Sequence, residues 1–247
     1  MNRNMKEMGF RRYSTRLFLE GFVVVVSILI AFLLDAWWQN RQSENELELE
    51  LAGVRAELEF NRSLVLREIQ SLNRISSTGS SVIEMMYAAK DSPSVQISDS
   101  MAWLVTLLSP TMDASFGAVE ALIGSGRLGE IENPALRSGL GGLKNVFEDA
   151  VEDELLARQI QIEQQVPMIF DRIDLAPLIR IDAEIFGAGA SVTEEVQSYV
   201  NVDYPNDTEV RNVMQHRMSW LVSAGFEMDR LLEHLDDLIN MIPPARE

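Results

Sequence analysis

No cysteine occurs among the 247 residues of the chain. Without thiols the chain has no disulfide, no thiolate-bound zinc or iron–sulfur cluster and no cysteine nucleophile. A chain without thiols also suits an oxidising compartment, where a stray thiol would react. The absence excludes several classes of enzyme and electron carrier, but it does not by itself place the protein outside the cytoplasm.

Histidine is almost as scarce, since His216 and His234 are the only two. They lie eighteen residues apart on one expected helix, which separates them by about 27 Å, so they cannot bind one metal ion. The glycine-rich stretch 124–129 lacks the Lys-Ser/Thr pair of a phosphate-binding loop, and the acids at 203–209 lack the spacing of a calcium loop. We therefore predict no catalytic residue, no metal, no cofactor and no enzymatic activity.

Basic residues are outnumbered, because 21 Lys and Arg stand against 38 Asp and Glu. The imbalance is uneven along the chain: residues 1–16 carry five basic side chains and one acid, whereas residues 39–247 carry 16 basic and 35 acidic ones. Such an acidic segment repels nucleic acid and anionic lipid. We expect no nucleic-acid partner, and either a basic protein partner, divalent cations or simply a solvated acidic exterior.

Only one stretch of the chain is long and apolar enough to cross a bilayer. Gly21–Leu34 contains fourteen uncharged residues, and extension to residues 17–38 gives a helix of about 33 Å, which matches the hydrocarbon thickness. Trp37 and Trp38 fall where interfacial aromatics gather. The bulky, charged residues 34–38 do not resemble a signal-peptidase site. We predict a retained transmembrane helix in contact with the lipid bilayer.

The basic arm 1–16 predicts the orientation of this anchor, because positive charge marks the cytoplasmic side. Residues 39–247 would then form an extracytoplasmic domain, in the periplasm of a bacterial cell whose inner membrane holds the anchor. Glu20 is the one residue of the span that invites a functional interpretation. We interpret it as snorkelling to the headgroups near Arg16, with a proton path or a helix contact as the alternatives.

Helical periodicity predicts an all-α fold. Apolar residues at 3–4 spacing continue beyond the anchor, with Asn61 and Glu68 at two seam positions, and predict a helical stalk to about residue 76, where S-S-T-G-S-S (76–81) ends it. The seam residues are Leu47, Leu51, Val54, Leu58, Val65, Leu72 and Ile75. Asn61 would fix the register of the packed helices or line a pocket.

The rest of the chain predicts an antiparallel helical bundle on this stalk. Further helices are expected at about 82–90, at 101–108 capped by Asp99 or Ser100, at 114–123 capped by Asp113, from Asn133-Pro134 to about 166, and from a capping box at Asn206–Glu209 to about 242. The last has an apolar seam at Leu221, Ala224, Met228, Leu231, Leu235, Leu238 and Ile242. Pro167 would end or kink its helix, and 179–186 is a possible short strand within an irregular region, 173–205.

Five acids crowd into seven residues of the expected helix that starts at Pro134: Glu148, Asp149, Glu152, Asp153 and Glu154. We interpret them as one exposed face that could receive a basic partner. The candidate partner-binding residues are therefore Glu148, Glu152 and Asp153 on this helix, and Glu20, Trp37 and Trp38 at the membrane.

Two stretches resemble a family of short bacterial single-pass membrane proteins. I-L-I-A-F-L-L-D-A-W-W-Q-N-R at Ile28–Arg41, followed by Glu57-Leu58 and Asn61, is similar to that family's anchor, which ends in an acid-x-Trp motif. The stretch Ala121–Leu136 is similar to a second motif of the family. The likeness covers about residues 17–145. It implies a helical exported domain, and it implies no activity.

These observations favour a non-enzymatic function. The leading hypothesis is a membrane-anchored scaffold or accessory subunit that packs against other membrane protein subunits, with homo-oligomerisation also open. The alternative is a small-ligand sensor module, which would have to signal through a partner because the expected cytoplasmic arm is only about sixteen residues.

Overall fold

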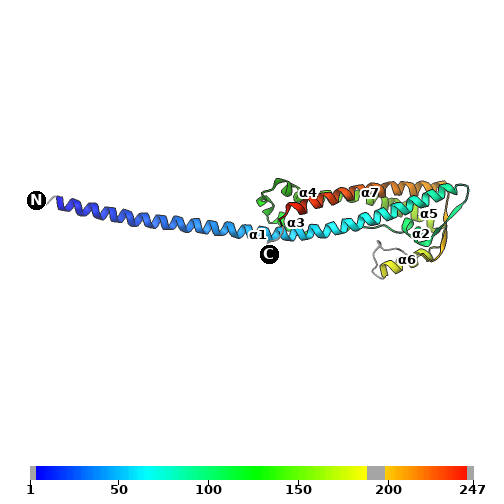
Figure 1. The fold of residues 1–247 in the computed structure, drawn as a ribbon, viewed down its shortest axis with the longest axis horizontal. Helices are drawn as coiled ribbons and strands as arrows, with labels where there is room; N and C mark the ends of the chain where they lie inside the picture. Colours follow the sequence, from blue (N-terminus) through cyan, green and yellow to red (C-terminus); the bar gives the residue numbers. More distant parts are fainter. Residues whose placement is uncertain (1–3, 188–197, 244–247) are drawn as a thin grey trace. The chain divides into compact units, whose positions relative to one another are not determined.

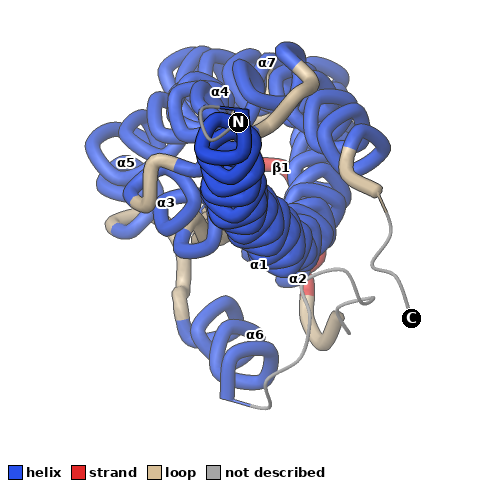
Figure 2. The backbone as a smooth tube through the Cα atoms, turned by 90° about the vertical axis from the view of Figure 1, so that its left-hand side faces the viewer, coloured by secondary structure: helices blue, strands red, loops and turns tan. Residues whose placement is uncertain are grey.

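The structure is a computed structural model that describes residues 4–187 and 198–243, with side chains from residue 22 onward. The fold is all-α, as predicted (Figures 1 and 2). Its helices are α1 (Asn4–Ala88), α2 (Asp99–Thr106), α3 (Gly117–Gly124), α4 (Pro134–Ile160), α5 (Val166–Phe170), α6 (Ala176–Gly187) and α7 (Thr208–Met241). Two short strands, β1 (Ser94–Ser98) and β2 (Asn201–Pro205), a 3-10 turn at Arg127–Glu130 and a π-helical turn at Gln161–Gln165 complete it.

Within the described residues, the chain divides into two compact units, one that ends at Leu51 and one that begins at Ala52. In the first unit, α1 carries an 18-residue window of mean hydropathy 2.0, none of it buried. Its large apolar side chains from Phe22 to Leu34 are exposed, except for the half-buried Val26. By length and composition, this helix is able to cross a membrane, as predicted.

In the second unit, α1 and α7 are antiparallel. The Arg55 guanidinium donates to the carbonyl oxygens of Ile239 and Ile242 at 2.9 and 2.7 Å. Farther along the same helix, Gly79 lies directly against Met218. Residue numbers therefore rise along α1 as they fall along the adjacent α7, and Figure 1 shows the two helices side by side.

Helix α4 is the third long helix, and it also runs antiparallel to α7. Gly139 near its start lies against Leu238, while Gln165, just beyond its end, binds Arg217. The seam predicted for α7 is buried at every position, and so is the α1 seam from Val54 onward. The two earlier α1 positions, Leu47 and Leu51, are only half-buried. The predicted antiparallel bundle is confirmed.

The S-S-T-G-S-S segment at 76–81 does not end the helix, contrary to our prediction, because α1 continues to Ala88. Ser76, Ser77 and Ser81 each donate to a backbone carbonyl three or four residues earlier, which satisfies their hydroxyls within the helix. At Gly79 an added Cβ would lie 2.1 Å from Met218 Sδ. The small residues here serve close helix packing.

The break between α1 and β1 is held by Asn206. Its amide donates to the carbonyl oxygens of Met86, Ala89 and Ser92, at the end of α1 and just after it. The predicted capping box therefore begins one residue too early. Asp207 is the N-cap of α7, and it accepts hydrogen bonds from the amides of residues 209 and 210.

The two strands were missed by the sequence analysis, and the predicted strand at 179–186 is wrong. β1 and β2 pair antiparallel, from Ser94 opposite Pro205 to Ser98 opposite Asn201. Residues 179–186 belong to α6, where Leu178, Ile181 and Ile185 are buried at helical spacing. In Figures 1 and 2, α6 lies outside the three long helices of its unit.

The start of α4 is as predicted and its end is not. Asn133 accepts hydrogen bonds from the amides of Ala135 and Leu136 and caps the helix. Pro167 does not end the helical path, since a π turn follows Ile160 and α5 continues to Phe170. The Val166 amide donates to the Gln161 carbonyl, five residues back, so the path gains a residue just before the proline.

Helix α3 takes its N-terminal cap from another helix rather than from Asp113. Glu57 of α1 accepts hydrogen bonds from the amides of Ala118 and Val119 and from the Ser115 hydroxyl. The carboxylate also complements the positive end of the α3 dipole. α1 therefore organises the loop before α3 as well as the core.

Candidate functional site

The membrane-facing candidates lie on the first unit. Trp37 and Trp38 are 62% and 64% exposed, which fits side chains that would contact an interface rather than a protein core. Glu20 lies on α1, but its side chain is outside the described residues.

The acidic face on α4 is smaller than predicted. Glu148, Asp149 and Glu152 are exposed, Asp153 is half-buried, and Glu154 is buried. Glu154 follows the buried Ala150 by four residues, which puts it on the core stripe of the helix. The interpretation of all five acids as one exposed face is therefore wrong for Glu154.

Glu154 belongs instead to a pair of buried acids. Glu68 of α1 is 5% exposed and Glu154 is 4% exposed. Burial raises the pKa of Glu68 to about 7. Burial, and then the charge of Glu68, raise the pKa of Glu154 to about 8, which the nearby Arg158 opposes only in part. The spacing indicated only a register-setting seam residue, whereas Glu68 is one of two buried acids with a raised pKa.

A second buried polar cluster surrounds Arg217 of α7, which is 1% exposed. Its guanidinium donates to the carbonyl oxygens of Val105 and Leu108 at 2.6 Å each, and to the side-chain oxygen of Gln165 at 3.0 Å. Burial lowers the pKa of Arg217 to about 10. The acceptors that hold this cation are neutral oxygens.

The π turn presents two glutamines to the same cluster. Gln161 donates to the carbonyl oxygens of Thr106 and Leu108, and Gln165 donates to that of Val105 and to the Tyr204 hydroxyl. These carbonyls are at the C-terminal end of α2, where a helix leaves acceptors unpaired and carries partial negative charge. The cluster therefore caps α2 inside the core.

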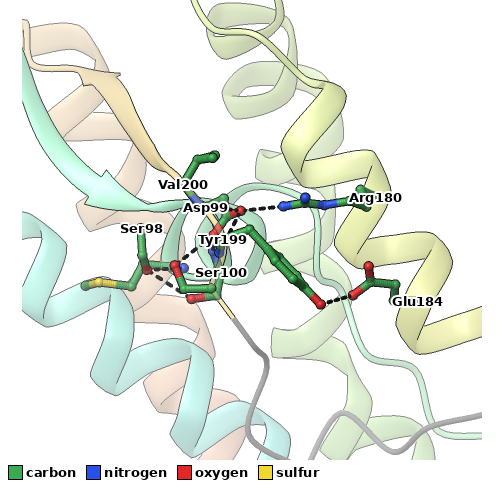
Figure 3. Close-up of polar contacts among 9 residues, drawn as sticks. Ser98, Asp99, Ser100, Arg180, Glu184, Tyr199 and Val200 are labelled. Carbon is green, nitrogen blue, oxygen red and sulfur yellow. Dashed lines mark hydrogen bonds and ion pairs between the residues drawn. The ribbon is translucent and has the colours of Figure 1, made fainter.

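A third cluster is centred on Asp99 at the start of α2 (Figure 3). Its carboxylate is fully buried and accepts from the Ser198 hydroxyl, the amides of Tyr199 and Val200, and Arg180 at 3.0 Å. Although burial opposes it, the hydrogen bonds from the Ser198 hydroxyl and from the amides of Tyr199, Val200 and Ser100 lower the pKa of Asp99. Asp99 was expected to be a helix cap, but the N-cap of α2 is Ser98.

The Asp99 cluster attaches α6 to the rest of its unit. The Arg180 guanidinium stacks 3.8 Å from the centre of the Tyr199 ring, and the Tyr199 hydroxyl donates to Glu184 (Figure 3). A separate hydrogen bond joins the Trp103 indole to Asp182 at 3.1 Å. These polar groups hold α6 and the neighbouring backbone in position.

A shallow groove of about 450 Å³ lies between α1 and α7. Ser80, Ile83 and Glu84 line it from α1, and Gln215, Met218, Ser219 and Val222 line it from α7. Three of these side chains are apolar and four are polar, and the groove is largely open to solvent.

Within the described residues, no three His, Asp or Glu side chains are grouped as a metal site would need. His216 accepts a hydrogen bond from Trp220 on the outside of α7. No family model, no curated protein and no solved structure matches the chain. The resemblance to the short single-pass membrane proteins therefore stays a prediction.

Proposed function

We propose that the chain is a membrane-anchored extracytoplasmic scaffold or accessory subunit of a larger membrane protein complex, without catalysis. One observation carries the proposal. α1 is a single helix that contains both the exposed apolar segment and the first core helix of the second unit. An anchor that is continuous with the fold suits a protein whose task is to hold a domain at a membrane.

The interior of the second unit supports the same proposal. Asn61 binds both the amide and the carbonyl of Ser115, and Asn206, Gln165 and Arg217 also bind backbone carbonyls. Buried polar groups that tie segments of backbone together favour one rigid conformation. These polar groups stabilise the shape of the domain and are not directed at a substrate.

The partner surface that we propose is the exposed acidic group Glu148, Asp149 and Glu152 on α4. With 35 acids among residues 39–247, association with a basic partner would be steered by charge and weakened by salt. Glu20, Trp37 and Trp38 are the proposed contacts within the membrane. The anchor would place the N-terminus in the cytoplasm and the bundle in the periplasm of a bacterial inner membrane.

The test is co-purification in mild detergent with a variant in which Glu148, Asp149 and Glu152 are changed to lysine. The matched control changes Asp91, Asp113 and Asp237, three exposed acids elsewhere on the unit, to lysine. Loss of a stoichiometric subunit from the first variant alone supports the acidic face as the contact. Equal recovery with both variants, at low and high salt, would reject it.

The groove between α1 and α7 favours the alternative, a small-ligand sensor that signals through a partner. Native mass spectrometry of the purified chain separates the two proposals. A bound metabolite that is lost when Val222 is changed to tryptophan, with no co-purifying subunit, favours the sensor. Stoichiometric subunits without such a metabolite favour the scaffold.

A further inference from the structure

Two carboxylic acids reach the interior of the second unit from different helices. Glu68 lies on the buried stripe of α1, and Glu154 lies on that of α4. The buried neighbours of Glu154 along its helix, Ala150 and Ala157, have small side chains. The charge of Glu68 acts on Glu154, so the two groups lie within interaction range.

Neither acid is satisfied as a carboxylate. Glu68 Oε1 and Glu154 Oε2 are buried and have no hydrogen-bond partner within the described part of the chain. A buried carboxylate without donors or a counter-ion is strongly destabilising, whereas the neutral acid is tolerated far better. Two such groups near each other cannot both ionise without mutual repulsion.

The charged groups around Glu68 and Glu154 do little to stabilise their ionised forms. α4 contributes Arg158, one turn beyond Glu154, which is exposed and lowers the pKa of Glu154 only in part. α1 contributes the exposed Arg67, which binds Ser63. The register set by Arg62–Asp236, Gly79–Met218 and Gly139–Leu238 brings one charged turn of α7 to this level of the bundle. Its residues are Glu227, Asp229 and Arg230, of which Glu227 and Arg230 pair with each other.

We propose that Glu68 and Glu154 form a proton-operated contact between α1 and α4. The two helices pack fully while the pair holds its protons, and they separate locally when both carboxyls ionise. This inference is independent of the proposed scaffold function, because it concerns the interior of the second unit alone.

The direction of the pH effect follows from the two pKa values. Both are raised above the ordinary value of 4.5, to about 7 for Glu68 and about 8 for Glu154. The folded chain therefore binds more protons than the unfolded chain between about pH 4.5 and pH 8. Stability that depends on the pair is fully present below the unfolded value and is lost as the pH rises through 7 and 8.

Thermal unfolding of the full chain in detergent tests this, with circular dichroism from about pH 5 to about pH 9. Between about pH 6 and pH 9 the wild-type Tm should fall by at least about 4 °C. The double variant Glu68→Gln/Glu154→Gln should lose most of this fall and unfold at a higher temperature than wild type at alkaline pH. The control Glu148→Gln/Glu152→Gln, on the exposed face of α4, should keep it. Equal pH dependence in wild type and the Glu68/Glu154 variant would overturn the proposal.

Separation of the helices requires its own measurement. Because the chain has no cysteine, Gln70→Cys and Leu155→Cys give unique spin-label sites on exposed positions of α1 and α4. The distance between the labels should lengthen or broaden from about pH 6 to about pH 9, and it should stay constant when Glu68 and Glu154 are both glutamine. A wild-type distance that does not change with pH would overturn the separation of α1 from α4.

Discussion

Arg217 is the residue at which the interior departs most from an apolar core. A guanidinium has five donors in a fixed plane, and this one gathers carbonyls from the end of α2 and the side chain of Gln165 in one place. Helix α2 ends inside the protein, where water cannot serve its last carbonyls. A long cationic side chain at a seam position of α7 solves that problem, which no aliphatic residue could.

We therefore expect Arg217→Leu to destabilise the fold severely. The change removes the only donor that the described residues offer to the Gln165 side-chain oxygen and one of the donors to each of the Val105 and Leu108 carbonyls, and a buried group left unsatisfied costs about 1–3 kcal/mol. Urea unfolding followed by circular dichroism measures the loss. Arg230→Leu, at an exposed position of the same helix, is the control. Similar midpoints for both variants would show that the Arg217 contacts contribute little.

At Gly79 the constraint is the space available for a side chain. A Cβ at this position would lie 2.1 Å from Met218 Sδ and 2.9 Å from its Cγ, whereas a Cβ at Gly53 of the same helix meets nothing within 4 Å. The same substitution should therefore have opposite effects at the two sites.

We expect Gly79→Ala to lower the stability by about 1–3 kcal/mol through overpacking. Gly53→Ala should raise it by about 0.5–1 kcal/mol, because alanine is the better helix former. Thermal unfolding of the two variants measures both effects. Met218→Ala should relieve the cost of Gly79→Ala. If the stability losses of Gly79→Ala and Met218→Ala were fully additive in the double variant, the close contact would be contradicted.

At the scale of elements, the ends of helices are fixed by side chains from distant parts of the chain. Glu57 of α1 caps the start of α3, the glutamines of the π turn bind the end of α2, and Asn206 binds the end of α1. The π turn has its own reason in this scheme. It brings Gln161 and Gln165 to the same cluster, just before Pro167.

Asn206→Ala should accordingly loosen the junction of α1, β1 and α7. Three carbonyls lose the side-chain donor, that of Met86 within α1 and those of Ala89 and Ser92 just after it, and we expect a loss of about 2–3 kcal/mol. Hydrogen exchange should rise first in residues 86–92. Asn240→Ala, at an exposed position of α7, should leave exchange in that segment unchanged.

At the scale of the whole molecule, the uneven charge and the apolar segment of α1 predict one orientation. A reporter active only in the periplasm should be active when fused after Glu247 and silent when fused after Met8, because the five basic side chains of the first 16 residues keep that end in the cytoplasm. A cytoplasmic reporter should give the opposite pattern. Reversing these charges to glutamate should reduce the difference, and activity of the periplasmic reporter at Met8 in the wild type would contradict the orientation.

The amino-acid sequence alone was sufficient for the class of fold, the apolar segment, the long seams of α1 and α7 and the Asn133 cap. These features depend on local periodicity or on neighbours within a few residues. Other features depend on the tertiary structure and differ from what the local sequence pattern predicts. Gly79 stays inside a helix and lies against Met218, 179–186 is helical, and the buried Glu154 feels the charge of Glu68. Met218 and Glu68 are far from Gly79 and Glu154 in the chain, and local spacing holds no information about a partner that only folding brings near.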